Sequence, residues 1–299
     1  MGLDPRHISV VIPARDEAVA IGHVVSSLRQ ADLEWVEIVV VDDGSLDGTA
    51  VAAQAVGARV IRHPVPRGYG AALKSGIRAS KGTFVLTVDG DGQHPPEEIR
   101  KLLTLSDTHD LVSGHRVRRW HSPLWRMPGK WVLGRLSSYL VGRPIPDLNC
   151  GLRLYRRDVM LRYLPLCSDA YSFTATSLLL LLAWGYRVAF VPVDVLPCSS
   201  QGRVTVRTGS DVLLLLLRMA TLLDPLRIFV PMSAIALLLG IAWGVPYVLA
   251  GHGISVGALL LMLSALLLFA VGLLSDQIAQ LRKAQLEGSY VRNRRDSEI

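Results

Sequence analysis

The chain has 299 residues, 50% of them hydrophobic, and its mean hydropathy of +0.35 is high for a wholly soluble protein. The formal net charge of +7 and the isoelectric point of about 9.6 suit an anionic membrane surface or a phosphorylated substrate. Nucleic acid is discounted as a partner because few basic and aromatic residues cluster and no zinc-finger spacing occurs, and the three isolated cysteines are typical of a reducing compartment.

Strand and helix signals alternate along residues 1–208. Strands are predicted at 8–13, 36–43, 58–63, 83–91, 110–114 and 186–193, and helices at 17–29, 47–56 and 69–79. Pro95 and Pro96 open a further helix, with Glu97 and Glu98 in its first turn. This βαβα order predicts an α/β domain with a Rossmann-like, mainly parallel sheet covered by helices.

Polar clusters follow three of the predicted strands. They are "PARDE" after the first strand, "DDGS" after the second and "DGDGQ" after the fourth. Ligands of open α/β sheets bind beyond the carboxyl ends of the strands, so these clusters predict one site built from three segments. The first turn lacks GxGxxG, which disfavours a dinucleotide-binding oxidoreductase.

Two carboxylates, Asp89 and Asp91, stand directly after the fourth strand, where their mutual repulsion is costly. A cation between them removes that cost. Mg²⁺ or Mn²⁺ is commonly held by one or two carboxylates together with substrate phosphates, and Gln93 offers a further neutral oxygen. A polar turn without a metal is the alternative, which the strand context and the two companion clusters disfavour.

Residues 209–225 carry a shorter apolar run. The stretch from Asp211 to Asp224 is too short and too interrupted by charge to cross a membrane. It predicts an amphipathic helix at the membrane interface, with Arg218 near the lipid head groups. A core helix of the preceding domain is the alternative.

Residues 226–299 hold two uncharged stretches, 228–250 and 254–275. Each exceeds the roughly 20 residues that a helix needs to cross about 30 Å of hydrocarbon, so a transmembrane hairpin with a basic tail is predicted. A buried hairpin in a soluble core is the alternative, and the all-round apolar character disfavours it. Lys and Arg flank the pair but are absent from its connection, which predicts an inner or plasma membrane protein with the α/β domain and both termini in the cytoplasm.

One face of the first span carries small residues at a spacing of four: Ala236, Gly240 and Gly244. Such a stripe favours close helix packing. It predicts either a homo-oligomer or packing against the second span.

Five motifs in this order, "IPARDE", "VDDGSLDGT", "RGYGAALKSGI", "VDGDGQHPPEEI" and "DLNCGLRLYRRD", resemble those of a GT-A glycosyltransferase of family 2. With the two trailing helices, the chain is similar to the polyprenyl-phosphate glycosyltransferases, a group that includes the dolichyl-phosphate mannose synthases. The resemblance covers about residues 7–230 and extends to the helices. It implies inverting, metal-dependent transfer of one sugar from a nucleotide-sugar donor to a membrane polyprenyl phosphate.

The resemblance also implies residue roles. The nucleoside would be held by Pro13, Arg15, Glu17, Asp42 and Asp43. The metal and diphosphate would be held by Asp89, Asp91 and Gln93. The acceptor phosphate is expected at Arg116 and Arg126, where relatives place arginines. By charge and position, Lys130, which stands where relatives often have a serine, and Arg203 and Arg207, just before the predicted interfacial helix, are also expected to reach this head group. Asp89, Asp91 and Arg116 are the expected catalytic residues.

Three positions depart from the family pattern. Cys150 replaces a usual serine, Leu152 a usual aromatic residue, and Thr176 a glutamate that many relatives have. These departures leave the donor nucleotide and sugar open.

Two other functions fit parts of the pattern. A processive polysaccharide synthase also joins this fold to membrane helices, but it would normally carry a QxxRW motif and more spans. A catalytically inactive membrane scaffold would be expected to have lost an aspartate of the pair, whereas this chain keeps both Asp89 and Asp91.

Overall fold

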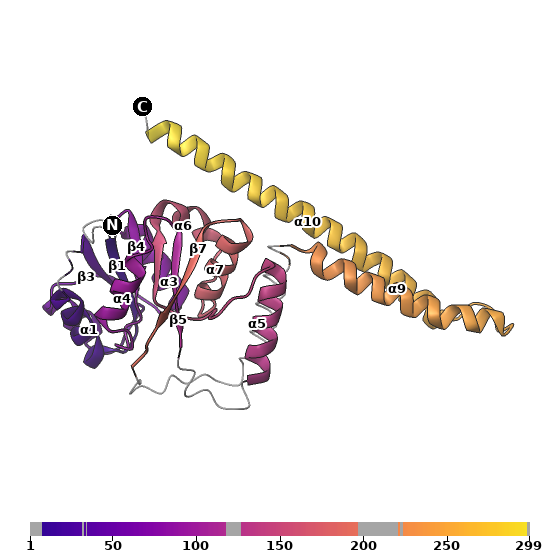
Figure 1. Ribbon diagram of the computed structural model, residues 1–299, viewed down its shortest axis with the longest axis horizontal. Coiled ribbons are helices and arrows are strands. Elements are labelled where there is room, and N and C mark those ends of the chain that lie inside the picture. The colour runs from indigo at the N-terminus through magenta and orange to yellow at the C-terminus, as the bar shows by residue number, and fades with distance from the viewer. Residues whose placement is uncertain are drawn as a thin grey trace. The chain divides into compact units, whose positions relative to one another are not determined.

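The described strands form one seven-stranded mixed sheet in the order β3-β2-β1-β4-β6-β5-β7 (Figure 1). The computed structural model describes residues 8–31, 33, 35–117, 127–196, 221 and 224–297, and their side chains except those of 127–133 and 286–297. The chain divides into two compact units: Met1–Thr208, which holds the sheet, and Gly209–Ile299, which contains two long helices.

Helices alternate with strands through most of the first unit. The strands are β1 (Ile8–Ala14), β2 (Glu37–Asp42), β3 (Arg59–Arg62), β4 (Phe84–Thr87), β5 (Leu111–Arg116), β6 (Arg153–Arg156) and β7 (Val188–Val193). The helices are α1 (Ala18–Gln30), α2 (Thr49–Ala55), α3 (Tyr69–Ala79), α4 (Pro96–Leu103), α5 (Met127–Val141), α6 (Arg157–Tyr163) and α7 (Phe173–Ala183), with a 3₁₀ turn at Leu164–Leu166. The predicted α/β class is confirmed.

The central strands run parallel. β1 pairs with β2 on one side and with β4 on the other, and β5 pairs in parallel with β7. β6 is antiparallel to both β4 and β5, and the sequence patterns did not predict this strand. It is only four residues long and begins and ends with arginine, so no run of strand-forming residues marks it.

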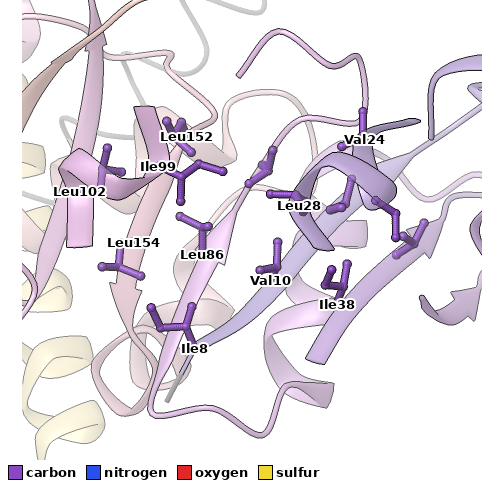
Figure 2. Packing of buried hydrophobic residues seen from close by; sticks show 14 of the residues in the cluster. Ile8, Val10, Val24, Leu28, Ile38, Leu86, Ile99, Leu102, Leu152 and Leu154 are labelled. Atoms are coloured by element: carbon purple, nitrogen blue, oxygen red, sulfur yellow. The ribbon is translucent and has the colours of Figure 1, made fainter. Parts of the chain in front are cut away.

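Alternate residues of the central strands pack on opposite faces of the sheet. On one face, Val10, Ile38 and Leu86 join a buried cluster with residues of α1 and α4, as Figure 2 shows. On the other face lies α3, where Gly76 faces the side chains of Val11 and Val41. A Cβ at position 76 would collide with Val11 and lie 3.1 Å from Cγ2 of Val41, so this glycine allows the close approach of helix and sheet.

The second unit contains α9 (Leu226–Leu249) and α10 (Val256–Ser297). Leu226–Leu249 and Val256–Gln285 are each long and apolar enough to cross a membrane, and only 17% of either apolar window is buried. A core helix of a soluble protein is mostly buried, so this exposure argues against the soluble hairpin. α10 continues well past residue 275, where the second span was expected to end, because the basic tail extends the same helix to Ser297.

The small-residue stripe of α9 faces α10. A Cβ at Gly240 would lie 3.0 Å from Cγ of Met262, and one at Gly244 would lie 3.1 Å from Cβ of Ala258. Of the two alternatives that the stripe left open, packing against the second span therefore accounts for Gly240 and Gly244. The predicted interfacial helix lies almost wholly outside the described residues.

Candidate functional site

The carboxyl ends of β1, β2 and β4 meet at one edge of the sheet. Ala14 is in register with Asp42, and the backbone N–H of Asp43 donates to the carbonyl of Ala14 at 2.9 Å. On the other side of β1, the N–H of Val88 donates to the carbonyl of Val11 at 3.1 Å. The parallel register therefore places the three polar clusters side by side.

Asp89 lies just past the end of β4, confined between a tyrosine and a glycine. Oη of Tyr69 donates to Oδ1 of Asp89 at 2.7 Å. The carboxylate lies against Cα of Gly151, where an added Cβ would be 2.5 Å from Cγ of Asp89. Burial raises the pKa of Asp89, and the hydrogen bond from Tyr69 and the charges of Arg116 and Arg153 offset this only in part.

Asp91 and Glu17 add further negative charge. Burial and the charge of Asp89 raise the pKa of Asp91, while its Oδ1 accepts from the backbone N–H of Gln93 at 3.1 Å. Burial raises the pKa of Glu17, and Asp91 is the largest charged contributor to that shift. Carboxylates from the ends of β1 and β4 thus repel one another, which is the electrostatic condition that a cation relieves.

His94 follows the pair and is neutral. Burial lowers its pKa to about 4, and its side chain is 3% exposed. Nε2 lies 4.0 Å from Oδ2 of Asp89, and Nδ1 is buried without a hydrogen-bond partner in the described part of the chain. A neutral imidazole here does not compensate the carboxylates, so their repulsion persists at neutral pH.

Asp42 and Asp43, at the end of β2, are engaged within the protein. Oδ1 of Asp42 accepts from the N–H of Ser45 at 2.8 Å, and Oδ2 lies 3.3 Å from Nε of Arg62. Both Asp42 and Asp43 are buried, with side chains at most 6% exposed.

Asp43 organises the loop that precedes α3. Its carboxylate accepts from Nδ1 of His63 at 2.7 Å and from the backbone N–H groups of Arg67 and Gly68, each at 2.8 Å. Burial raises its pKa, but these hydrogen bonds outweigh the burial and lower the pKa overall.

Arg116, the last residue of β5, forms a two-point ion pair with Asp147. Nε lies 2.7 Å from Oδ2 and Nη2 lies 3.1 Å from Oδ1. The hydrogen bond to Asp147 raises the pKa of Arg116; at Asp147, burial raises the pKa but the contacts with Arg116 lower it overall. The pair places a fixed cation at the side of the site where its charge reaches Asp89.

A second guanidinium, that of Arg153, is fully buried in β6. It donates to the carbonyl oxygens of Cys150 at 3.0 Å and Leu148 at 2.8 Å, and also to that of Thr174. No carboxylate pairs with it among the described contacts. Its charge acts on Asp89, so it is a fixed positive group beneath the carboxylate pair.

The other predicted site residues are placed as follows. Pro13 is buried in β1. Arg15 is exposed, with Nε 3.8 Å from Oδ2 of Asp16. The backbone carbonyl of Gln93 accepts from the backbone N–H of Leu196 at 3.0 Å. Lys130 lies in α5, with a side chain outside the described set. Arg126, Arg203 and Arg207 lie outside the described residues, as does Cys198.

Several residues that contact the site were not predicted for it: Tyr69, His94, Asp147, Gly151 and Arg153. All five stand inside the quoted motifs "RGYGAALKSGI", "VDGDGQHPPEEI" and "DLNCGLRLYRRD". Nothing in the spacing alone pairs Asp147 with Arg116, because that contact depends on the antiparallel pairing of β5 with β6.

The donor set suits a hard divalent cation that also binds phosphate. Among the described residues, no three His, Cys, Asp or Glu side chains group closely enough to form a complete metal cage. Mg²⁺ and Mn²⁺ sites in nucleotide-dependent enzymes need only one or two carboxylates, with substrate phosphates completing the sphere. Asp89 and Asp91 have raised pKa values, and no cationic side chain of the described residues lies within hydrogen-bond distance of either carboxylate, so both fit that arrangement.

Several curated proteins are similar in sequence to this chain. An uncharacterised protein of Methanocaldococcus jannaschii is 31% identical over 199 residues, which cover 63% of this chain and 81% of that protein. A dolichyl-phosphate hexose transferase of Haloferax volcanii is 35% identical, covering 51% of this chain and 68% of the relative. An undecaprenyl-phosphate 4-deoxy-4-formamido-L-arabinose transferase of Pseudomonas aeruginosa is 36% identical, covering 51% and 48%.

Solved structures show the same fold. Glucosyl-3-phosphoglycerate synthase of Mycobacterium tuberculosis, in complex with Mn²⁺, UDP and phosphoglyceric acid, superposes with a TM-score of 0.59 at 24% identity. The match covers 71% of this chain and 78% of that one. The same synthase with Mg²⁺ and UDP gives a TM-score of 0.57 at 22% identity, covering 70% and 78%.

Family models match both units. Residues 224–281 match the GtrB C-terminal hairpin, the segment that contains α9 and most of the apolar part of α10. Residues 9–164 match glycosyl transferase family 2. This range includes β1 from its second residue and strands β2 to β6, and leaves out β7. The sheet, the carboxylate edge and these matches agree: the chain belongs to glycosyltransferase family 2.

Proposed function

We propose that this glycosyltransferase transfers one sugar from a nucleotide-sugar to a membrane polyprenyl phosphate, with inversion of configuration at the anomeric carbon of the sugar. The observation that carries the proposal is the carboxylate pair at the edge of a family 2 sheet, in a chain that also has two helices able to span a membrane. Relatives named as dolichyl-phosphate and undecaprenyl-phosphate transferases support the acceptor class.

The chemistry of this acceptor matches the groups at the site. A hydroxyl acceptor needs a general base, but a phosphate monoester has its second pKa near 6 and is already anionic at neutral pH. The protein therefore has to bring two anionic groups together and stabilise the leaving diphosphate, which asks for cationic groups rather than a strong base.

Asp89 and Asp91 would hold a divalent cation, with Gln93 as a further oxygen ligand. When bound, Mg²⁺ or Mn²⁺ would neutralise charge on the diphosphate and stabilise it as a leaving group. The raised pKa values of both aspartates support this assignment, because a site that disfavours bare carboxylates gains most from a cation. Structures of relatives with UDP and Mn²⁺ or Mg²⁺ support the same use of metal.

The nucleoside would lie along the end of β1, near Pro13, Arg15 and Glu17. Asp42 and Asp43 would line the nucleoside site and fix the backbone around it, since both carboxylates already accept hydrogen bonds from backbone N–H groups. Direct contact of either one with the base would require the present contacts to open, whereas Glu17 is only partly buried.

The acceptor phosphate would bind Arg116. Asp147 engages Nε and Nη2 of this residue, so Nη1 remains for a second anion. Arg126, Lys130, Arg203 and Arg207 would complete the acceptor site; the described side chains do not include them.

The hairpin would anchor the enzyme where its lipid substrate lies. Charge flanking the helices supports an orientation with the catalytic domain and both termini in the cytoplasm, because the connection between α9 and α10 carries no Lys or Arg. Nucleotide-sugars would then reach the site from the same side.

A product assay tests the proposal. Full-length protein in detergent is incubated with a polyprenyl phosphate, Mg²⁺ or Mn²⁺ and each nucleotide-sugar of a panel. The mass of the lipid product is then measured by mass spectrometry. One added sugar, absent with EDTA and absent for Asp91→Asn, is the expected result. A growing polymer would instead identify a processive synthase, and absence of both transfer and nucleotide binding would identify an inactive scaffold.

A further inference from the structure

Tyr69 provides the one direct side-chain hydrogen bond to Asp89 among the described contacts. Its hydroxyl donates to Oδ1 at 2.7 Å. Burial and the charge of Asp89 raise the pKa of Tyr69, so the phenol stays protonated and acts as the donor. Tyr69 is the first residue of α3.

Two glycines flank Tyr69 and let another loop approach it closely. Gly68 has φ +107, and a Cβ there would lie 2.6 Å from the carbonyl oxygen of Asp169. A Cβ at Gly70 would collide with the carbonyl oxygen of Ser168 and lie 2.8 Å from that of Ala170. Residues 168–170 therefore pack backbone to backbone against both sides of Tyr69, which only glycines permit.

The same loop contacts the ring of Tyr69 and is joined to α3 by an ion pair. The rings of Tyr69 and Tyr171 stack with centroids 5.4 Å apart and planes 13° apart. Nζ of Lys74, one turn further along α3, lies 2.7 Å from Oδ1 of Asp169, and the N–H of Ala71 donates to the carbonyl of Asp169 at 3.0 Å. On the other side, Asp43 holds the N–H of Gly68.

These contacts leave the Asp89 carboxylate little freedom. The backbone of Gly151 lies against the carboxylate, closest to Oδ2, and the hydroxyl of Tyr69 satisfies Oδ1. Oδ2 accepts no hydrogen bond in the described contacts and lies 4.0 Å from Nε2 of His94. Partners of this kind around a ligating carboxylate orient it, and their loss typically weakens metal binding or activity by about 10- to 100-fold.

We propose that Tyr69 is a positioning residue for the divalent-cation site: its hydroxyl fixes Asp89 so that Oδ2 faces the cation, and the loop at residues 168–171 braces Tyr69 for that purpose. The inference rests on the proposed function, in which Asp89 is a metal ligand. Because Tyr69 acts through Asp89, its removal affects the affinity for metal before it affects the transfer step at saturating metal.

The test measures metal affinity directly. Mn²⁺ is titrated calorimetrically into full-length Tyr69→Phe in detergent with saturating UDP, and the same variant is assayed for transfer across a range of Mn²⁺ concentrations. We expect the Kd for Mn²⁺ to rise about 10- to 100-fold, while kcat at saturating Mn²⁺ returns close to that of the unaltered protein. Tyr163→Phe is the matched control, because its hydroxyl pairs with Tyr186 at 2.8 Å and not with Asp89.

Two further variants separate the outcomes. An unchanged Kd in Tyr69→Phe, together with lost Mn²⁺ binding in Asp89→Asn, overturns the role of Tyr69 and leaves the metal assignment standing. Unchanged Mn²⁺ binding in Asp89→Asn removes the metal assignment and the role of Tyr69 with it. Should Tyr69→Phe not fold, Tyr171→Ala keeps the hydroxyl but removes the stacked ring; a Kd raised about 2- to 10-fold supports the bracing, and an unchanged Kd contradicts it.

Discussion

Arg116 and Asp147 are 31 residues apart in sequence and meet in a two-point ion pair, with Nε 2.7 Å from Oδ2 and Nη2 3.1 Å from Oδ1. The backbone N–H of Arg116 also donates to Oδ2, at 3.3 Å. Asp147 thereby sets the direction of a side chain that is 41% exposed and whose Nη1 has no hydrogen-bond partner among the described residues. An arginine held by one carboxylate in this way is prepared to receive a second anion.

We predict that Arg116 serves the acceptor and not the donor. A charge-assisted contact to phosphate contributes about 1.5–3 kcal/mol, so Arg116→Ala should raise the acceptor KM or lower kcat by about 10- to 100-fold. Asp147→Asn keeps the side-chain volume but weakens the ion pair that orients the Arg116 guanidinium, so it should also raise the acceptor KM or lower kcat. Acceptor kinetics and calorimetric titration of donor measure the two effects; a collapse of donor affinity with normal acceptor dependence would assign Arg116 to the diphosphate instead.

Asp89→Asn and Asp91→Asn should each lower transfer by about 100-fold or more, because each removes a carboxylate charge without changing side-chain volume. EDTA should have the same effect on the unaltered protein, reversibly on adding back Mn²⁺ or Mg²⁺. Asp158→Asn, in the first turn of α6, is a matched control that removes an aspartate outside the cluster. Full activity of either site variant would contradict the metal assignment.

Asp91→Asn should also raise the thermal unfolding midpoint of the metal-free protein. The pKa of Asp91 is raised by burial and by Asp89, so its ionised form opposes folding and the substitution removes that repulsion. In the presence of Mn²⁺ and UDP the order should reverse, since only the unaltered protein gains from the ligands. A midpoint lowered in the absence of metal would mean that Asp91 is a stabilising residue rather than a strained ligand.

The raised pKa values of Glu17, Asp89 and Asp91 give the pH dependence its sign. Groups whose pKa is higher in the folded state stabilise it below their unfolded pKa, and that contribution is lost as pH rises through the folded pKa. Bound metal replaces the protons, so the midpoint shift caused by Mn²⁺ and UDP should be larger at neutral than at mildly acidic pH. Differential scanning calorimetry at a series of pH values measures the midpoint with and without Mn²⁺ and UDP. A larger midpoint shift at acidic pH would rule out competition between metal and protons.

A reporter fused after Ile299 should lie in the cytoplasm, and a tag inserted near His252 should be accessible only from the opposite side. The physical basis is the absence of Lys and Arg from the α9–α10 connection and their presence beyond both ends. Labelling of the inserted tag by a membrane-impermeant reagent in intact cells measures it. Protection of the tag in intact cells and exposure of the C-terminus would reverse the proposed orientation.

Gly240→Leu should weaken the packing of α9 against α10. A Cβ added at this position would lie only 3.0 Å from Cγ of Met262, and overpacking costs about 1–3 kcal/mol. Ala234→Leu, on an exposed face of α9, enlarges a small residue without that contact and should change little. The thermal midpoint and the mass of the protein in detergent are measured together. A lower mass with an unchanged midpoint would show that Gly240 packs between copies of the chain instead.

Local pattern was sufficient to predict most elements of the sheet and its helices. The run from Tyr69 to Ala79 and the helix opened by Pro95 and Pro96 form as expected, because helix periodicity and proline act within one or two turns. The uncharged stretches predicted both long apolar helices. Strand ends were less well predicted: β4 stops at Thr87, so Asp89 and Asp91 lie in the turn beyond it.

By itself, the sequence determined the chemistry at the site edge: carboxylates after three strands, a family motif set and an apolar hairpin. Only the tertiary structure decided which side chains meet there. The antiparallel pairing of β6 with β5 brings Asp147 to Arg116, and its pairing with β4 brings Gly151 to Asp89. The loop at residues 168–171 packs against Tyr69, whose hydroxyl donates to Asp89. These contacts join residues tens of positions apart, and their geometry follows from strand register and backbone approach, which no local pattern of residue types encodes.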